Sequence, residues 1–159
     1  MYKRILVPVD GSATSLRGLK EAVRLAKQQH AALRLLHVVD ELPLIMNLEG
    51  GIYIESMLET MRAEGRKILA RAQAQARGLG ARPQAVMLES MSGRVADVIV
   101  REAKKWRADV IVIGTHGRRG VTRLVLGSDA EEVLRASPVP VLLVRGAPAR
   151  RAKAPKKRR

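Results

Sequence analysis

The stretch Asp109-Val110-Ile111-Val112-Ile113 decides the fold class, and it runs directly into Gly114. Its apolar run is short and rich in β-branched residues, which predicts a buried strand rather than a helix. Glycine after a strand marks a turn. The stretch therefore predicts a central strand that ends at a loop.

Predicted strands and predicted helices alternate on either side of this stretch. Short apolar runs predict strands, and apolar residues three or four apart predict helices. The expected strands are residues 5–9, 32–39, 84–88, 109–113 and 140–144. The expected helices run from the Ser12–Ser15 region to about His30, from Met57 to Gly78 or Gly80, from Ser92 to Ala103, and from Ser128 to Arg135. This alternation predicts one doubly wound, Rossmann-like α/β domain, with a mostly parallel sheet and helices on both faces.

Composition excludes several kinds of function. The chain of 159 residues has no cysteine, which excludes disulfides, thiolate catalysis and zinc–sulfur sites. Aromatic residues make up 2% of the chain, so base stacking is an unsuitable main function. No signal peptide or run of about 18 apolar residues is present, so we expect a cytoplasmic protein without a membrane partner.

Positive charge is concentrated at the C-terminus. The chain has a net charge of +15, and residues 146–159 contain lysine and arginine but no acid. We expect residues 1–145 to form a nucleotide-binding domain and residues 146–159 a disordered basic tail. The tail could be a solubilising end, or it could bind nucleic acid or an acidic partner through Arg150–Arg159. No amphipathic or lipidation signal favours a membrane surface.

The segment from Gly114 to Ser128 carries the strongest functional signal. Its glycines allow close backbone approach to a phosphate, and Ser128 stands where a helix is expected to begin and to offer free N–H groups to an anion. Arg118 lies between them and adds positive potential. Gly114 and Asp10 both end strands, where doubly wound sheets bind ligands. The alternative is a flexible turn followed by a helix that Ser128 caps.

The spacing Gly114-x2-Gly117-x9-Gly127-Ser128 resembles the nucleotide-binding motif of the universal stress protein family. Three other segments resemble strands of that family in the same order, namely residues 5–12, 108–114 and 137–144. The resemblance covers about residues 2–145 and leaves only the basic tail outside it.

The resemblance implies a parallel sheet in the order 3-2-1-4-5 and a homodimer that pairs through the last strand, residues 139–144. It also implies ATP or another adenine nucleotide as ligand, with adenine beside Pro8, Val9 and Val38 or Val39. Asp10 would lie near the ribose or a phosphate-bound Mg²⁺ ion. The expected nucleotide-binding residues are Pro8, Val9, Asp10, Val38, Val39, Gly114, His116, Gly117, Arg118, Gly127 and Ser128.

Catalysis has little support in the sequence. Neither a Gly-x-Ser-x-Gly elbow nor an ordinary P-loop is present. Only His116 and Asp10 are candidates for positioning a water, so we expect no catalytic residue and at most slow ATP hydrolysis. Asp129 departs from the apolar residue usual in the family. Its carboxylate would repel a triphosphate, although an acid in the first turn of a helix also favours the helix dipole.

The predicted function is therefore nucleotide-dependent stress response or signalling by a dimer. The alternative is an interaction module that binds nucleic acid or an acidic partner through its tail.

Overall fold

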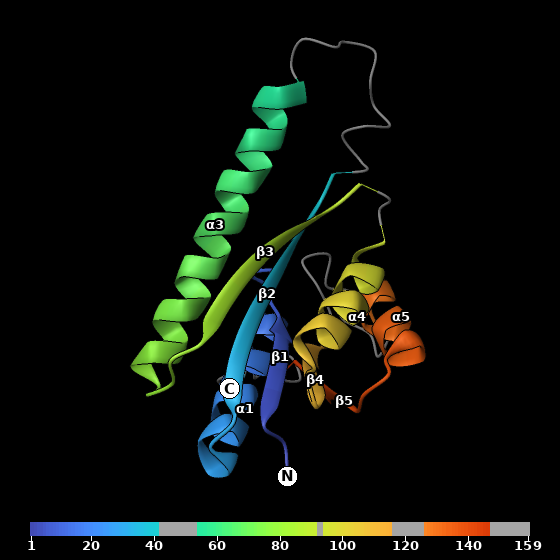
Figure 1. Cartoon of the computed structure of the whole chain (residues 1–159). Coiled ribbons are helices and arrows are strands. Elements are labelled where there is room, and N and C mark those ends of the chain that lie inside the picture. The colour runs from blue at the N-terminus through green and yellow to red at the C-terminus, as the bar shows by residue number, and fades with distance from the viewer. Residues whose placement is uncertain (42–53, 92–93, 116–125, 147–159) are drawn as a thin grey trace, which may run out of the picture.

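The computed structural model describes residues 1–41, 54–91, 94–115 and 126–146. These residues form a five-stranded parallel sheet in the order β3-β2-β1-β4-β5, as predicted (Figure 1). The strands are β1 (Arg4–Pro8), β2 (Ala32–Asp40), β3 (Gln84–Ser90), β4 (Val110–Gly114) and β5 (Val141–Val144).

The sheet reverses its strand order at β1. In the register, Ile5 of β1 pairs with Leu33 of β2 on one side and with Val110 of β4 on the other. The strands β2 and β3 therefore lie on one side of β1, and β4 and β5 lie on the other. In open parallel sheets, ligands bind beyond the carboxyl ends of the strands at such a reversal.

In the described parts of the chain, two helices cover each face of the sheet. The helices are α1 (Ala13–Gln29), α3 (Ile54–Gly78), α4 (Val95–Trp106) and α5 (Ser128–Ala136). Buried residues of α1 and α3 pack on one face, and those of α4 and α5 pack on the other (Figure 1). Each expected helix is present, and the bounds differ from the predictions by a few residues.

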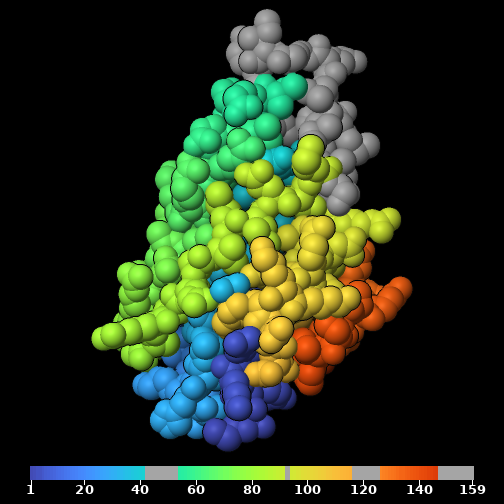
Figure 2. Space-filling model, viewed as in Figure 1, coloured from blue at the N-terminus to red at the C-terminus, as the bar shows by residue number. Residues whose placement is uncertain are grey.

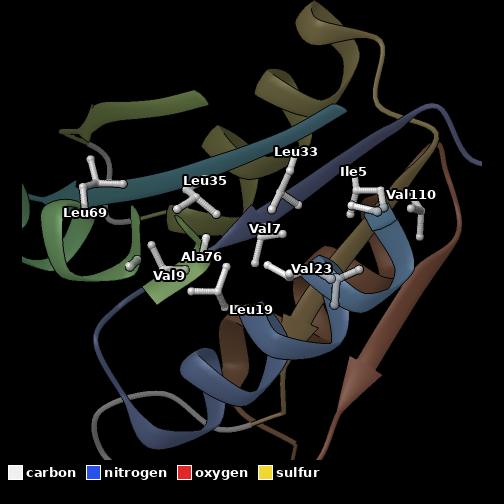
Figure 3. Packing of buried hydrophobic residues seen from close by; sticks show 14 of the residues in the cluster. Ile5, Val7, Val9, Leu19, Val23, Leu33, Leu35, Leu69, Ala76 and Val110 are labelled. Atoms are coloured by element: carbon white, nitrogen blue, oxygen red, sulfur yellow. The ribbon is translucent and has the colours of Figure 1, made fainter. Parts of the chain in front are cut away.

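The core consists of aliphatic side chains, as the low aromatic content requires. Leu19 and Val23 of α1 and Leu69 of α3 pack beneath Val7 and Leu35 of the sheet (Figure 3). Each such side chain contributes about 1.5–3 kcal/mol when fully buried. On the opposite face, alternate residues of the same strands pack against α4 and α5. This double burial explains why the strands are nearly continuous apolar runs.

The first helix begins directly after β1 at a side-chain cap. Ser12 is the N-cap, and its Oγ accepts a hydrogen bond of 3.1 Å from the backbone N–H of Ser15. Within the Ser12–Ser15 region predicted for the helix start, Ser12 is therefore the cap. The helix ends at His30, which adopts a left-handed conformation with φ of 53°.

Candidate functional site at the carboxyl edge of the sheet

The end of β4 and the beginning of α5 are joined directly. Thr115 follows β4, and its N–H donates a hydrogen bond of 3.0 Å to the carbonyl of Val144 in β5. The carbonyl of Thr115 in turn accepts a hydrogen bond of 2.8 Å from the N–H of Gly127. The two ends of the predicted glycine segment, Gly114 and Gly127–Ser128, therefore lie together at the carboxyl edge.

The start of α5 has the features of an anion site. Gly127 is the N-cap and provides no side chain to cap the helix, and the side chain of Ser128 is exposed. The first N–H groups of a helix have no partner within the helix, and the helix dipole attracts negative charge to them. Asp129 and Glu131 lie in the same first turn and oppose that attraction.

Gly114 has a structural role that the sequence did not reveal. A Cβ atom at this position would lie 2.8 Å from the carbonyl carbon of Thr14 and 2.9 Å from the backbone nitrogen of Ser15. The first turn of α1 thus passes against the end of β4 where only glycine fits. As a result, the beginnings of α1 and α5 meet the end of β4 from opposite faces of the sheet.

The residues expected beside adenine divide between the two faces. Pro8 and Val38 are half-buried, and Val38 packs with the core of the α4–α5 face. Val9 and Val39 are buried at 4% and 3% exposure. Val9 belongs to the core of the α1–α3 face. The structure therefore leaves Pro8 and Val38 accessible at the edge, whereas Val9 and Val39 are enclosed.

Val9 is also held by its backbone. Its N–H donates a hydrogen bond of 2.8 Å to the carbonyl of Leu36, and its carbonyl lies 2.7 Å from Nδ1 of His37. His37 lies inside β2 and is buried. These contacts fix the chain direction immediately before Asp10.

Asp10 is half-buried where the chain passes from β1 to α1. Its Oδ1 accepts a hydrogen bond of 2.9 Å from the N–H of Ser12, an arrangement that stabilises the turn. Within the described parts of the chain, no group of three histidine or acidic side chains is arranged to hold a metal ion. A Mg²⁺ ion at Asp10 would therefore need phosphate oxygens among its ligands, as Mg²⁺ commonly has.

A charged network that sequence reasoning missed lies at the same edge. Arg62 of α3 contacts Glu41 after β2 at 3.3 Å and Glu89 of β3 at 2.8 Å. The hydrogen bond to Glu89 is the main cause of a raised pKa at Arg62. These residues are more than 20 positions apart in sequence, so no local pattern predicts their contact. They fasten α3 to the ends of β2 and β3.

Several predicted residues lie outside the described residues. These are His116, Gly117 and Arg118 of the glycine segment, and Arg150–Arg159 of the tail. Thr115, by contrast, is a described residue that the prediction omitted. Its position directly after Gly114 was the available signal, because it extends the β4–β5 pairing by one hydrogen bond.

Comparison with known proteins identifies the family. The family model described as "Universal stress protein family" matches residues 1–145. The chain belongs to the universal stress protein family. It is 37% identical over 145 residues to universal stress protein MJ0531 of Methanocaldococcus jannaschii, covering 91% of this chain and 83% of the relative.

Solved structures of the family have the same fold. Universal stress protein UspA from Lactobacillus plantarum matches with a TM-score of 0.77 and 25% identity, covering 91% of this chain and 98% of that one. The universal stress protein from Archaeoglobus fulgidus in complex with dAMP matches with a TM-score of 0.63 and 26% identity, covering 90% of this chain and 98% of that one.

Among the described helices of the present chain, none is long and apolar enough to cross a membrane.

Proposed function

We propose that this universal stress protein binds an adenine nucleotide at the carboxyl edge of β1 and β4 and signals through a nucleotide-dependent dimer. The observation that carries the proposal is the junction of Thr115 with Gly127, because it places both ends of the glycine motif beside an uncapped helix start. The dAMP complex of the Archaeoglobus fulgidus protein supports adenine nucleotides as the ligand class.

In this proposal each part of the site has a separate task. The N–H groups at the start of α5 and the Ser128 hydroxyl bind phosphate, and Arg118 offsets the charge of Asp129. Pro8 and Val38 provide apolar contact for the base. Asp10 contacts the ribose or a Mg²⁺ ion that the phosphates also bind.

A single hydrogen bond links Thr115 of the proposed site to the edge strand β5. Val144 of β5 accepts from Thr115, so a ligand that orders the Thr115–Gly127 junction also acts on β5. Leu142 of the same strand is 42% exposed although it is a large apolar residue. We propose that β5 pairs with β5 of a second copy and that nucleotide binding shifts this equilibrium. A ligand shifts it only by the difference between its affinities for the two states.

Calorimetric titration tests nucleotide binding. The protein would be titrated with ATP, ADP, AMP and cAMP, with and without Mg²⁺. We expect binding of at least one of them, with loss of affinity in Gly117→Val and Ser128→Ala. Gly78→Val is the matched control, since Gly78 ends α3 with no atom within 4 Å of an added Cβ. Absence of binding by the parent protein, or equal weakening by the control, contradicts the proposal.

Two further measurements test whether Asp10 binds Mg²⁺ and whether the protein hydrolyses ATP. If Asp10 holds Mg²⁺ with the phosphates, Asp10→Asn weakens binding of Mg²⁺–ATP more than binding of metal-free ATP. Phosphate release would be followed in the parent, Asp10→Ala and His116→Ala proteins. Unchanged slow release in both variants removes these residues from any hydrolytic role.

Sedimentation analysis tests the dimer. Leu142→Lys is expected to shift the protein to monomer because it places charge on the pairing edge. Leu79→Lys is the control, because Leu79 has a similar exposure of 40%. It lies between α3 and β3, and β3 is at the opposite edge of the sheet from β5. A monomeric parent protein, with and without nucleotide, would exclude the proposed dimer.

A further inference from the structure

A second surface lies at the amino edge of the sheet, opposite the proposed nucleotide site. Each helix ends there and each following strand begins there, so helix ends and strand starts together form this edge (Figure 1). In Figure 2 it is the lower end of the molecule. We refer to it as the amino edge.

Three exposed cations meet at a hollow in the amino edge. The hollow lies between the end of α1 and the connection from α3 to β3. One part has a volume of about 520 Å³ and is lined by Arg77 and Arg82. An adjoining part of about 270 Å³ is lined by Lys27 and again by Arg82. Among the described residues, no acidic side chain lines either part.

The backbone fixes the position of Lys27. Lys27 Nζ donates a hydrogen bond of 3.3 Å to the carbonyl of Leu79. Gly80 follows with φ of +85°, and a Cβ at this residue would lie 3.4 Å from Lys27 Nζ. The turn after α3 therefore holds the ammonium group beside the hollow. The ammonium group still has two further protons to donate to an anion.

Exposed cations continue from the hollow along the amino edge. Lys3 and Arg4 lie at the start of β1, and Lys104, Lys105 and Arg107 lie at the end of α4. Within the described parts of the chain, none of these five side chains forms an ion pair. These five exposed cations therefore add to the positive charge of Lys27, Arg77 and Arg82 at the amino edge.

Asp109, a carboxylate at the amino edge, is already hydrogen-bonded to the backbone. Asp109 precedes β4, and its Oδ2 accepts hydrogen bonds from the backbone N–H groups of Lys3 and Arg4 at 2.6 and 2.8 Å. It therefore bonds to the backbone and leaves the basic side chains without a carboxylate partner.

Helix stability explains only part of this charge. A basic residue in the last turn of a helix interacts favourably with the helix dipole, which accounts for Lys27, Arg77 and Lys104. It does not account for Lys3 or Arg82, which lie outside the helices. The cations at these positions point to a ligand that carries negative charge.

We propose that the amino edge binds the phosphate backbone of a nucleic acid. A row of separated cations suits a chain of regularly repeated phosphates better than a single small anion. Binding is independent of base sequence. The Trp106 ring at the end of α4 is covered by the guanidinium of Arg34 at 4.6 Å, so it is not free for base stacking on that face. The site lies at the opposite edge of the sheet from the proposed nucleotide site and consists of described residues.

Fluorescence anisotropy with a labelled DNA duplex of about 20 base pairs tests this proposal over about 50–200 mM salt. The test variant is Lys27→Gln/Arg77→Gln/Arg82→Gln in the full chain. The matched control is Arg17→Gln/Lys20→Gln/Lys67→Gln, which removes the same charge from exposed positions of the same two helices. A third variant replaces every lysine and arginine of residues 150–159 by glutamine. Thermal unfolding verifies that all variants are folded at the assay temperature.

The amino-edge variant is expected to bind at least about tenfold more weakly, with a salt slope reduced by about 2–3, since each phosphate contact contributes about 0.9. The control is expected to change affinity less than about threefold. Several results overturn the proposal: no duplex binding by the parent, equal loss in test and control variants, or loss only in the tail variant. Competition by polyglutamate as effective as that by unlabelled duplex would also overturn it, by indicating an acidic polypeptide as the partner.

Discussion

Gly114 approaches Thr14 so closely that a Cβ on the glycine would lie 2.8 Å from the carbonyl carbon of the threonine. The contact joins the last residue of β4 to the first turn of α1. The first glycine of the motif is therefore required by the packing of the chain itself. A loss of nucleotide binding on its substitution would not by itself identify a ligand contact.

We expect Gly114→Ala to lower the free energy of unfolding by about 1–3 kcal/mol, since the added methyl group meets backbone that cannot move aside. Gly18→Ala is the control on the facing helix, where an added Cβ would lie 3.4 Å from the nitrogen of Gly114. The control should be neutral or stabilising by up to about 1 kcal/mol, because alanine favours a helix. Urea denaturation measures both, and equal effects would contradict the packing argument.

Gly65 of α3 provides a second test of close packing. A Cβ at this position would lie 2.8 Å from His37 Cδ2 and 2.9 Å from Met87 Sδ. The His37 ring is held by the Val9 carbonyl, so it cannot turn away freely. We expect Gly65→Ala to cost about 1–3 kcal/mol. Gly78→Ala in the same helix meets no atom within 4 Å and should not destabilise. A Gly65→Ala protein as stable as the parent would show that the ring relocates.

The ion pair of Arg34 with Glu102 joins β2 to α4. The two side chains meet at 2.6 Å, and that of Glu102 is only 3% exposed. Arg34→Met leaves the carboxylate enclosed without its cation, and we expect a loss of up to about 3 kcal/mol because Arg34 itself is partly exposed. The double variant Arg34→Met/Glu102→Gln should recover part of this loss. A double-mutant cycle by urea denaturation measures the coupling, and strictly additive effects would argue against it.

Asp109 fixes the start of the chain to β4 through the N–H groups of Lys3 and Arg4. Asp109→Ala should lower the free energy of unfolding by about 1–2 kcal/mol, since two hydrogen bonds are lost. Asp109→Asn retains one carbonyl oxygen and should lose less. Hydrogen exchange at the amides of Lys3 and Arg4 gives a local readout. Unaltered exchange in Asp109→Ala would contradict this role.

The sequence predicted the sheet because strand and helix periods are local properties. Buried parallel strands such as residues 110–114 are almost wholly apolar, and each is separated from the next by a helix. Contacts between residues that are far apart in sequence produce no periodic pattern in the sequence. The pairing of Arg34 with Glu102 and that of Arg62 with Glu41 therefore became visible only in the folded chain.

The residues predicted for the site share one edge of the sheet, but the structure shows that they differ in burial. Resemblance to the family grouped Val9 and Val39 with Pro8 and Val38. Side chains of a strand alternate between faces, and this alternation encloses the first two in the core and leaves the others partly exposed. The packing role of Gly114 depends on where α1 crosses β4, which no local pattern specifies.

The direct bond between Gly127 and Thr115 also has a consequence for the exchange of residues between relatives. Because this bond joins the sheet to α5 directly, it fixes Thr115 and Gly127 relative to each other whatever residues stand between them. Under the proposed function, exchanging residues 116–125 between members of the family is therefore expected to change ligand preference while the described fold is preserved.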